Sequence, residues 1–307
     1  MISAEKAKTR KLISNPRKRS RTIFYICIMA LPVLQFVIFY IFVNLNSFIL
    51  AFKEFTDEYG LVSRLAGFKN FVWAWKNFSG NLYMLRNSLL QFLFTTAIGL
   101  TLAIIFSYYI YKKFFGASFF KFALFMPQII SSVVFVVLFK YLVTNVYKVL
   151  SGAELGLLDN DKTRLATVLF YNVWVSFGIN VILFSGSMNE INTSIIESAQ
   201  LDGANYVQEL WHIVLPMIWP TLTQFTVVGV SAIFTNQMNL FSFLSRGGLD
   251  VASFGYYFYI QTLESTSSGS MLNYPQLSAL GLLLTLIIMP VTILVRKCME
   301  KFGPKEY

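Results

Sequence analysis

Charged residues are scarce in this sequence. Of its 307 residues, 13% are Asp, Glu, Lys or Arg, whereas 56% are hydrophobic and 17% are aromatic. Soluble globular domains usually have about 25% charged and about 45–50% apolar residues, so this composition excludes a soluble protein. It indicates an integral membrane protein.

Cysteine and histidine are almost missing as well. The two cysteines, Cys27 and Cys298, exclude a disulfide framework, and there is a single histidine, His212. No His/Asp/Glu cluster, metal-ligand spacing or Ser/His/Asp set lies at membrane depth, so we expect no catalytic residue, no metal site and no enzymatic activity. The sequence also lacks a G-x-x-x-x-G-K-[ST] phosphate loop, and this chain is therefore not expected to bind ATP by that route.

Basic residues are unevenly distributed along the chain. The formal net charge is +10, but residues 1–21 hold eight of the 25 Lys and Arg residues and only one acid. This pattern argues against a nucleic-acid-binding face and predicts a basic cytoplasmic arm over residues 1–21. The apolar run that follows is too long for a signal peptide, so we expect it to stay in the mature protein.

Six apolar segments are long enough to cross a membrane, which takes about 20 residues. None of the six contains Asp, Glu, Lys or Arg. They are residues 22–52, 88–111, 122–139, 165–188, 216–243 and 277–295. The predicted fold is an all-α, polytopic membrane protein, with one six-helix domain over residues 22–302 and a cytoplasmic tail at 303–307.

Lys and Arg in the connections predict the orientation. With the N-terminus inside, the inner segments hold 15 of these residues and the outer segments hold 10. Cytoplasmic loops carry the excess, so both termini and the loop at 189–215 are predicted to be cytoplasmic. That loop has no Lys or Arg, and its acids indicate either a solvated face or a docking surface for a cytoplasmic protein. These acids are Glu190, Glu197, Asp202 and Glu209.

The loop also carries signals for two helices joined by a bend. Ser194 and Glu197 have the spacing of a capping box, which predicts a helix start. Gly203 suits the left-handed end of that helix. A second, amphipathic helix follows, and Pro216 and Pro220 fall near the first turns of the next apolar run, where proline is tolerated.

Residues 197–216 resemble the Glu-Ala-Ala loop of binding-protein-dependent ABC importer permeases. Eight positions match the family pattern, whereas Ser198 and Leu210 depart from it. The matching residues are Glu197, Ala199, Asp202, Gly203, Ala204, Ile213, Leu215 and Pro216. The resemblance implies a coupling helix that docks on a separate cytoplasmic ATPase dimer, which binds ATP and Mg.

A second patch, residues 244–248, resembles the Leu-Thr-x-Gly-Gly-Pro signature of carbohydrate-uptake permeases of the maltose and glycerol-phosphate type. Ser245 replaces the threonine and Leu249 the proline. The resemblance implies a prokaryotic plasma-membrane protein that imports a sugar or oligosaccharide. Its implied partners are a second permease subunit in a heterodimer and an extracellular solute-binding protein. A permease for an amino acid, peptide or polyol phosphate remains the alternative.

A secondary transporter is a further alternative, but one would need ionisable groups inside its spans. Polar side chains of the fourth and fifth spans instead predict a neutral solute path, with interhelical hydrogen bonding as the competing interpretation. These are Tyr171, Asn172, Trp174, Thr235, Asn236, Gln237 and Asn239. Helical spacing would place Asn236 and Asn239 on one face, and we expect this face to line the path with Trp174 as the stacking ring.

Overall fold

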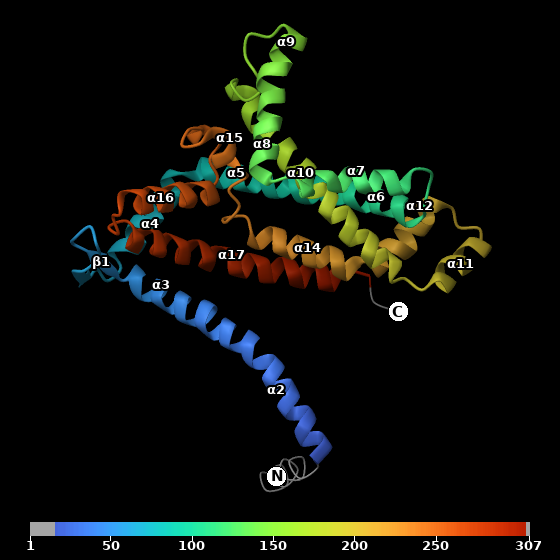
Figure 1. The fold of residues 1–307 in the computed structure, drawn as a ribbon, viewed down its shortest axis with the longest axis horizontal. Coiled ribbons are helices and arrows are strands. Elements are labelled where there is room, and N and C mark those ends of the chain that lie inside the picture. The colour runs from blue at the N-terminus through green and yellow to red at the C-terminus, as the bar shows by residue number, and fades with distance from the viewer. Residues whose placement is uncertain (1–15, 305–307) are drawn as a thin grey trace.

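The computed structural model describes residues 16–304. The first 15 residues of the predicted arm and the last three of the predicted tail lie outside the described residues. Figure 1 shows long helices running side by side, with a small hairpin at one end and a loop with two short helices, α11 and α12, at the other. Two parts leave this body: α2 diverges from it, and α8 with α9 projects sideways.

The described chain is a helical multi-pass membrane protein, as the sequence predicts. Five continuous helical stretches are long and apolar enough to cross a membrane. They are Ser20–Ala51, Leu82–Tyr111, Ser132–Ser151, Asp161–Asn189 and Tyr274–Phe302. A sixth is possible if Tyr206–Met217 and Trp219–Ser231, bent by 67° at Ile218, form one span.

Most of these stretches combine several helical elements, some of them π-helical turns. The first half of the chain contains α2 (Pro16–Phe36), η1 (Val37–Phe42), α3 (Val43–Ala51), α4 (Lys69–Gly80), α5 (Leu82–Leu93), η2 (Phe94–Leu100), α6 (Thr101–Tyr111), α7 (Ala117–Ile129), α8 (Ser132–Tyr141), η3 (Leu142–Val146) and α9 (Tyr147–Ser151). The second half contains α10 (Asp161–Asn189), α11 (Thr193–Leu201), α12 (Tyr206–Glu209), η4 (Leu210–Val214), α13 (Leu215–Met217), α14 (Trp219–Ser231), α15 (Leu240–Leu244), η5 (Leu249–Val251), α16 (Phe254–Ser268) and α17 (Tyr274–Phe302).

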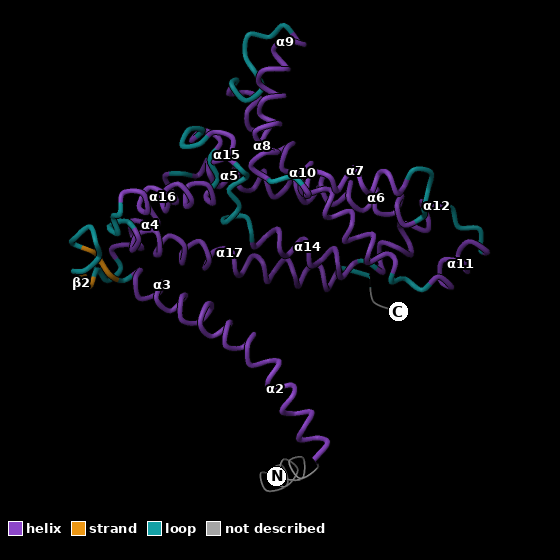
Figure 2. Tube along the Cα trace, viewed as in Figure 1, coloured by secondary structure: helices purple, strands orange, loops and turns teal. Residues whose placement is uncertain are grey.

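A two-stranded hairpin closes the end of the bundle opposite α11. Its strands, β1 (Lys53–Phe55) and β2 (Ser63–Leu65), pair antiparallel and are drawn in orange in Figure 2. The Asp57 carboxylate accepts from the N–H groups of Leu61 and Val62, at 2.9 and 2.6 Å, and so closes the turn. The Val62 bond holds the pKa of Asp57 below its usual value.

Two of the six predicted spans are wrong in detail. The third, at 122–139, is not one helix: α7 ends at Ile129, and Ile130 takes an extended conformation before α8 begins. The fifth, at 216–243, stops being helical after Ser231. Hydrogen-bonded turns, such as the one closed by the Thr235 N–H and the Ala232 carbonyl at 3.1 Å, replace the helix there, and a short helix, α15, follows.

The buried apolar side chains form two clusters, one towards each end of the bundle. We call the end of the molecule that carries the α11 loop its inner end and the opposite end its outer end. The outer cluster includes Tyr171, Phe243 and Tyr256, whereas the inner one joins α6 and α10 to the α11 loop through Phe184 and Ile196. Close backbone packing supports this core. A Cβ atom at Gly178 of α10 would lie 1.9 Å from the carbonyl oxygen of Leu124 in α7, so only glycine fits there.

Candidate functional site: the α11 loop and the interrupted fifth span

Helix α11 begins with a different cap from the predicted one. The side chain of Asn192 accepts from the N–H of Ser194 at 3.1 Å, so Asn192 is the N-cap, and the predicted Ser194–Glu197 capping box does not form. A capping box does form one helix later. The side chain of Asn205 accepts from the N–H of Gln208, and the side chain of Gln208 accepts from the N–H of Asn205, both at 2.9 Å.

The end of α11 follows the prediction at Gly203. This residue has φ +83°, in the left-handed region. The N–H of Gly203 donates to the carbonyl of Gln200 at 3.1 Å, and the N–H of Ala204 donates to that of Ala199 at 2.9 Å. This pair of bonds is a Schellman motif, which fixes the direction in which the chain leaves the helix.

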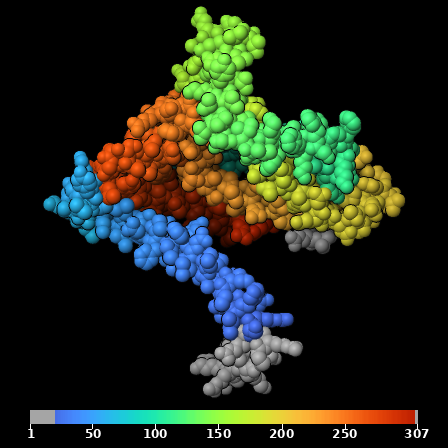
Figure 3. All heavy atoms as spheres, viewed as in Figure 1, coloured from blue at the N-terminus to red at the C-terminus, as the bar shows by residue number. Residues whose placement is uncertain are grey.

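Helix α11 has one face against the bundle and one open face. Ile196 is buried in the inner apolar cluster, whereas Glu197 and Leu201 are exposed, Leu201 by 89%. Figure 3 shows the loop as the yellow end of the molecule. The exposed face combines acid and apolar groups and is free to contact another protein.

One of the four acids of the loop does not belong to the predicted acidic surface. Glu209 is buried, with a side chain 1% exposed. Its Oε1 lies 2.6 Å from Nζ of Lys112 and accepts from the hydroxyl of Tyr108 at 3.0 Å. Its Oε2 accepts from the amide of Gln200 at 3.2 Å. The interpretation of Glu209 as a docking acid is therefore wrong, because an internal cation already neutralises it.

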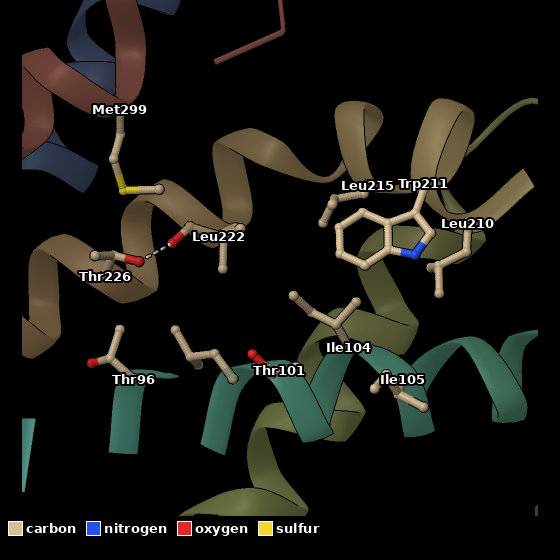
Figure 4. A pocket seen from close by; sticks show the side chains of 11 residues that line it. Thr96, Thr101, Ile104, Ile105, Leu210, Trp211, Leu215, Leu222, Thr226 and Met299 are labelled. Carbon is tan, nitrogen blue, oxygen red and sulfur yellow. Dashed lines mark hydrogen bonds between the residues drawn. The ribbon is translucent and has the colours of Figure 1, made fainter. Parts of the chain in front are cut away.

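The chain returns from the loop into the bundle along η4, α13 and α14. Pro216 and Pro220 occupy the first turns of α13 and α14, as predicted. Ile213, Leu215 and Pro216 are half-buried. Leu215 lines an apolar pocket of about 250 Å³ between this segment and α6, and Figure 4 shows Trp211 and Ile104 approaching it from its two sides.

The predicted outer half of the fifth span is an irregular segment, which disproves the shared helix face of Asn236 and Asn239. Met238 and Asn239 have positive φ values of 56° and 55°. Hydrogen bonds from side chains hold the segment instead. Asn236 Oδ1 accepts from the N–H of Met238 at 2.8 Å, and the hydroxyl of Ser253 donates to the Asn236 carbonyl at 2.8 Å.

Asn172 and Asn239, from the predicted path, do meet. The Asn239 amide donates to Oδ1 of Asn172 at 3.0 Å, and the Asn172 amide donates to the carbonyls of Met238 and Val168, at 3.0 and 2.8 Å. Irregular backbone within a membrane needs such internal partners, because lipid offers none. The Oε1 atom of Gln237 is buried and has no partner among the described residues.

The remaining predicted path residues lie in different surroundings. Tyr171 is 1% exposed and packs between Phe139 and Phe243, with ring centroids 4.9 Å from each. Trp174 is 38% exposed. Thr235 is exposed and lines a cavity of about 780 Å³ between α3, α14, α16 and α17, and Trp174 is not among the lining residues. The structure therefore does not bring Trp174 and Thr235 to one site.

Sequence reasoning missed Lys140. The predicted third span ended at Phe139, so Lys140 counted as part of an outer connection. It lies instead near the middle of the helical stretch Ser132–Ser151, and its ammonium donates to the Phe243 carbonyl at 2.7 Å. Among the described residues it has no ion-pair partner. A lysine inside an apolar helix marks a functional position more often than a structural one, and this was the available signal.

Comparison with known proteins agrees with this architecture. The model for "Binding-protein-dependent transport system inner membrane component" matches residues 95–305. The chain is 25% identical to the arabinooligosaccharides transport system permease protein AraP of Bacillus subtilis, covering 88% of this chain and 86% of AraP. It is 26% identical to the osmoprotective compounds uptake permease protein GgtC of Synechocystis, covering 76% and 85%.

Solved structures give the same fold. A chain of a bacterial alginate ABC transporter, in complex with a periplasmic protein that carries an alginate pentasaccharide, matches with a TM-score of 0.71 at 19% identity. The match covers 91% of this chain and 94% of the other. Because the family model spans more than half of the sequence, this chain belongs to the family of binding-protein-dependent transport system inner membrane components.

Proposed function

We propose that this chain is the permease subunit of an ATP-driven importer and carries a sugar or oligosaccharide into the cell. In this proposal residues 22–302 form the transmembrane domain, and residues 189–215 form its coupling loop. Residues 1–21, residues 303–307 and the coupling loop face the cytoplasm. An extracellular binding protein delivers the solute.

The observation that carries the proposal is the geometry of α11. This helix is capped at both ends and anchored on one side by Ile196, and its other side exposes Glu197 and Leu201 at the end of the bundle. A short, stiff helix with a free amphipathic face can fill a groove on a partner. We assign that groove to a separate ATPase dimer, which supplies the ATP and Mg sites.

Two further features bear on the proposed assembly: the open apolar surface of the first span, and a hydrogen bond that ties α17 to the α11 side. The helical stretch Ser20–Ala51 has no buried residue in its most apolar part, and α3 but not α2 packs against the bundle (Figure 1). Such an open apolar surface fits contact with a second permease subunit and with lipid. On the inner side, the indole N–H of Trp219 donates to the Met299 carbonyl at 3.0 Å, which ties the inner end of α17 to the α11 side.

The carbohydrate assignment rests on the relatives and on the chemistry of the interrupted fifth span. Broken helices with polar backbone groups are typical of solute sites near the middle of a membrane. Thr235 and Asn236 are exposed there, and Gln237 holds an unpartnered oxygen. Hydroxyl and amide groups of this kind can bind sugar hydroxyls. Trp174, which does not share a cavity with Thr235, offers an exposed ring for stacking at a separate point of the path.

The test is uptake of labelled sugars by the complete complex in liposomes, with Asn236→Ala, Gln237→Ala and Trp174→Ala. A lowered apparent affinity for sugar, with basal ATP hydrolysis intact, supports a solute path. Loss of assembly in all three variants, or no change in any of them, overturns it. Asn273→Ala, which removes an exposed amide outside both this segment and the coupling loop, is the control.

Lys140 favours a second candidate, an anionic sugar. Its ammonium donates to the neutral carbonyl of Phe243 and, within the described part of the chain, has no ion-pair partner. A carboxylate or phosphate on the solute could complete this site. Uptake of neutral and uronate oligosaccharides by the Lys140→Gln variant separates the two. A selective loss of the uronate supports the anionic solute, whereas equal rates leave the neutral sugar.

A further inference from the structure

The loop that carries α11 is joined to the second span by a buried ion pair. Lys112 follows α6 directly, and Glu209 ends α12. The ammonium lies 2.6 and 2.8 Å from the two carboxylate oxygens, and the side chains are 10% and 1% exposed. The second oxygen of Glu209 also accepts from Gln200, which lies within α11. One carboxylate thus contacts both the coupling helix and the end of a span.

Aromatic rings surround the lysine. Its ammonium lies 5.8 and 6.0 Å from the ring centroids of Tyr108 and Tyr111, both in α6, and 5.6 Å from that of Tyr206 in α12. Cations are attracted to such ring faces, and the rings keep water away from the pair. The Phe114 ring packs edge-on against Tyr206, at 5.3 Å. The cage is therefore built from both of the segments that the ion pair joins.

This arrangement resists separation. Two opposite charges at contact distance in a poorly solvated site attract strongly. Pulling them apart without water would leave each charge buried and unpaired, which costs more than breaking an exposed pair. A displacement of α12, which the Gln200–Glu209 hydrogen bond links to α11, therefore moves Lys112 with it more readily than it breaks the pair.

Apolar packing adds further contacts between the α11 loop and the spans. Ile196 of α11 shares the inner cluster with Ala103 of α6 and Val181 of α10. The hydroxyl of Ser107 in α6 donates to the carbonyl of Val181 at 2.8 Å, which fastens the second span to the fourth. The contacts thus run from α11 into α6 and onward to α10.

We propose that Glu209 and Lys112 are positioning residues that make α6 move with the coupling helix. The resemblance to known permeases implies that closure of the ATPase acts on the fourth and fifth spans, which flank the loop in sequence. The ion pair adds the second span as a direct recipient, although it lies almost 100 residues away along the chain. The inference rests on the proposed function, because it needs an ATPase that displaces α11.

The test measures a distance inside the complete complex in nanodiscs. Spin labels are attached at Ser194→Cys in α11 and at Lys113→Cys beyond α6, both exposed positions, after Cys27 and Cys298 are replaced by serine. Distances are measured without nucleotide and with a non-hydrolysable ATP analogue. We expect one narrow distribution of the distance between the two labels, which the ATP analogue does not change. A second label pair, with one label on each ATPase subunit, should show that the ATPase has closed in the same sample.

Variants of Glu209 and Lys112 should weaken the contact between the α11 loop and α6. Glu209→Gln and Lys112→Gln should broaden or shift the distribution when ATP binds, whereas Lys112→Arg, which keeps the charge, should not. Glu154→Gln removes an exposed acid outside the coupling loop and is the control. The inference is overturned if the distance changes on ATP binding in the unmodified pair, or stays unchanged in Glu209→Gln.

A second measurement separates positioning from folding. With the ATPase retained at the unmodified level, solute carried per ATP should fall about 2- to 30-fold in Glu209→Gln, the range expected when a coupling residue is removed. A defect that only tracks loss of the ATPase from the complex indicates a structural role and overturns the inference. If no sugar is transported but the distances behave as expected, the proposed substrate fails and the inference stands. If no ATPase binds the unmodified complex, both fail.

Discussion

The two ends of this molecule differ in whether local or distant residues determine their backbone structure. At the inner end, the α11 loop is built from local signals: Asn192 and Asn205 start helices, Gly203 ends one, and Pro216 lies in the first turn of α13. In the interrupted fifth span, positive-φ residues and buried amides form a structure that only distant segments hold in place. The comparison teaches that the helix ends of the α11 loop can be altered at small cost, whereas the backbone of the outer segment depends on tertiary contacts; the buried Glu209–Lys112 pair is the exception at the inner end.

The largest expected effect is at Gly255. A Cβ atom there would lie 2.5 Å from the carbonyl carbon and oxygen of Asn236, which are backbone atoms and cannot rotate away. Gly255→Ala should therefore destabilise the outer segment by about 3 kcal/mol, at the upper end of overpacking costs. The measurement is the thermal midpoint of the purified complex in detergent. Gly186→Ala, where no described atom lies within 4 Å of the new methyl group, should leave the midpoint unchanged.

Removal of the Asn172 amide should have the next largest effect. Asn172→Ala leaves the Asn239 amide and the Met238 carbonyl without a partner, at a cost of about 1–3 kcal/mol for a buried polar group. The same thermal measurement applies. Asn189→Ala removes an exposed amide from the same helix and is the control. Equal midpoints for the two variants would contradict the tertiary origin of the outer segment.

At the inner end, Gly203→Ala should cost only about 1 kcal/mol, the strain of a left-handed alanine. Because no described atom lies within 4 Å of the added methyl group, the complex should assemble. We expect the redirected α11 to lower sugar uptake per ATP. Gly203→Asn tolerates the left-handed conformation and should behave like the unmodified protein. Normal uptake by the alanine variant would show that the bend does not matter.

The smallest effect on stability is expected at Glu197. It does not close a capping box, so Glu197→Gln and Glu197→Ala should each change stability by less than about 0.5 kcal/mol. If the carboxylate contacts the ATPase, both variants should weaken ATPase binding equally, measured by surface plasmon resonance on nanodiscs. Glu197→Asp, which keeps the charge, is the control. A larger loss in the alanine variant alone would indicate side-chain packing rather than charge.

Much of the fold could be predicted from the sequence, because apolar length and turn residues are local properties. Four of the six predicted spans coincide with helical stretches of the structure. The break after Ile129 was not predicted, because Pro127 lies inside α7 and the helix ends two residues later without a glycine. The end of α14 at Ser231 is not followed by a proline or glycine either, and Gly229 lies inside the helix.

The candidate site was less predictable, because its decisive contacts join segments far apart in the sequence. Gly203 could be assigned from its neighbours. The burial of Glu209 could not, because it depends on Lys112, 97 residues away. The pairing of Asn172 with Asn239 spans 67 residues, and helical spacing gave the wrong geometry for Asn236 and Asn239 because the backbone there is not helical.

Lys140 has a consequence for biosynthesis. It lies near the centre of the helical stretch Ser132–Ser151, where a lysine raises the free energy of insertion by about 2.5–3.5 kcal/mol. Its partner, the Phe243 carbonyl, is synthesised about 100 residues later. The third span therefore enters the bilayer before its lysine can be satisfied. Insertion as a pair with α10, whose Tyr171 and Trp174 rings pack against Phe139, would offset part of this cost until the fifth span arrives and the ammonium reaches its carbonyl.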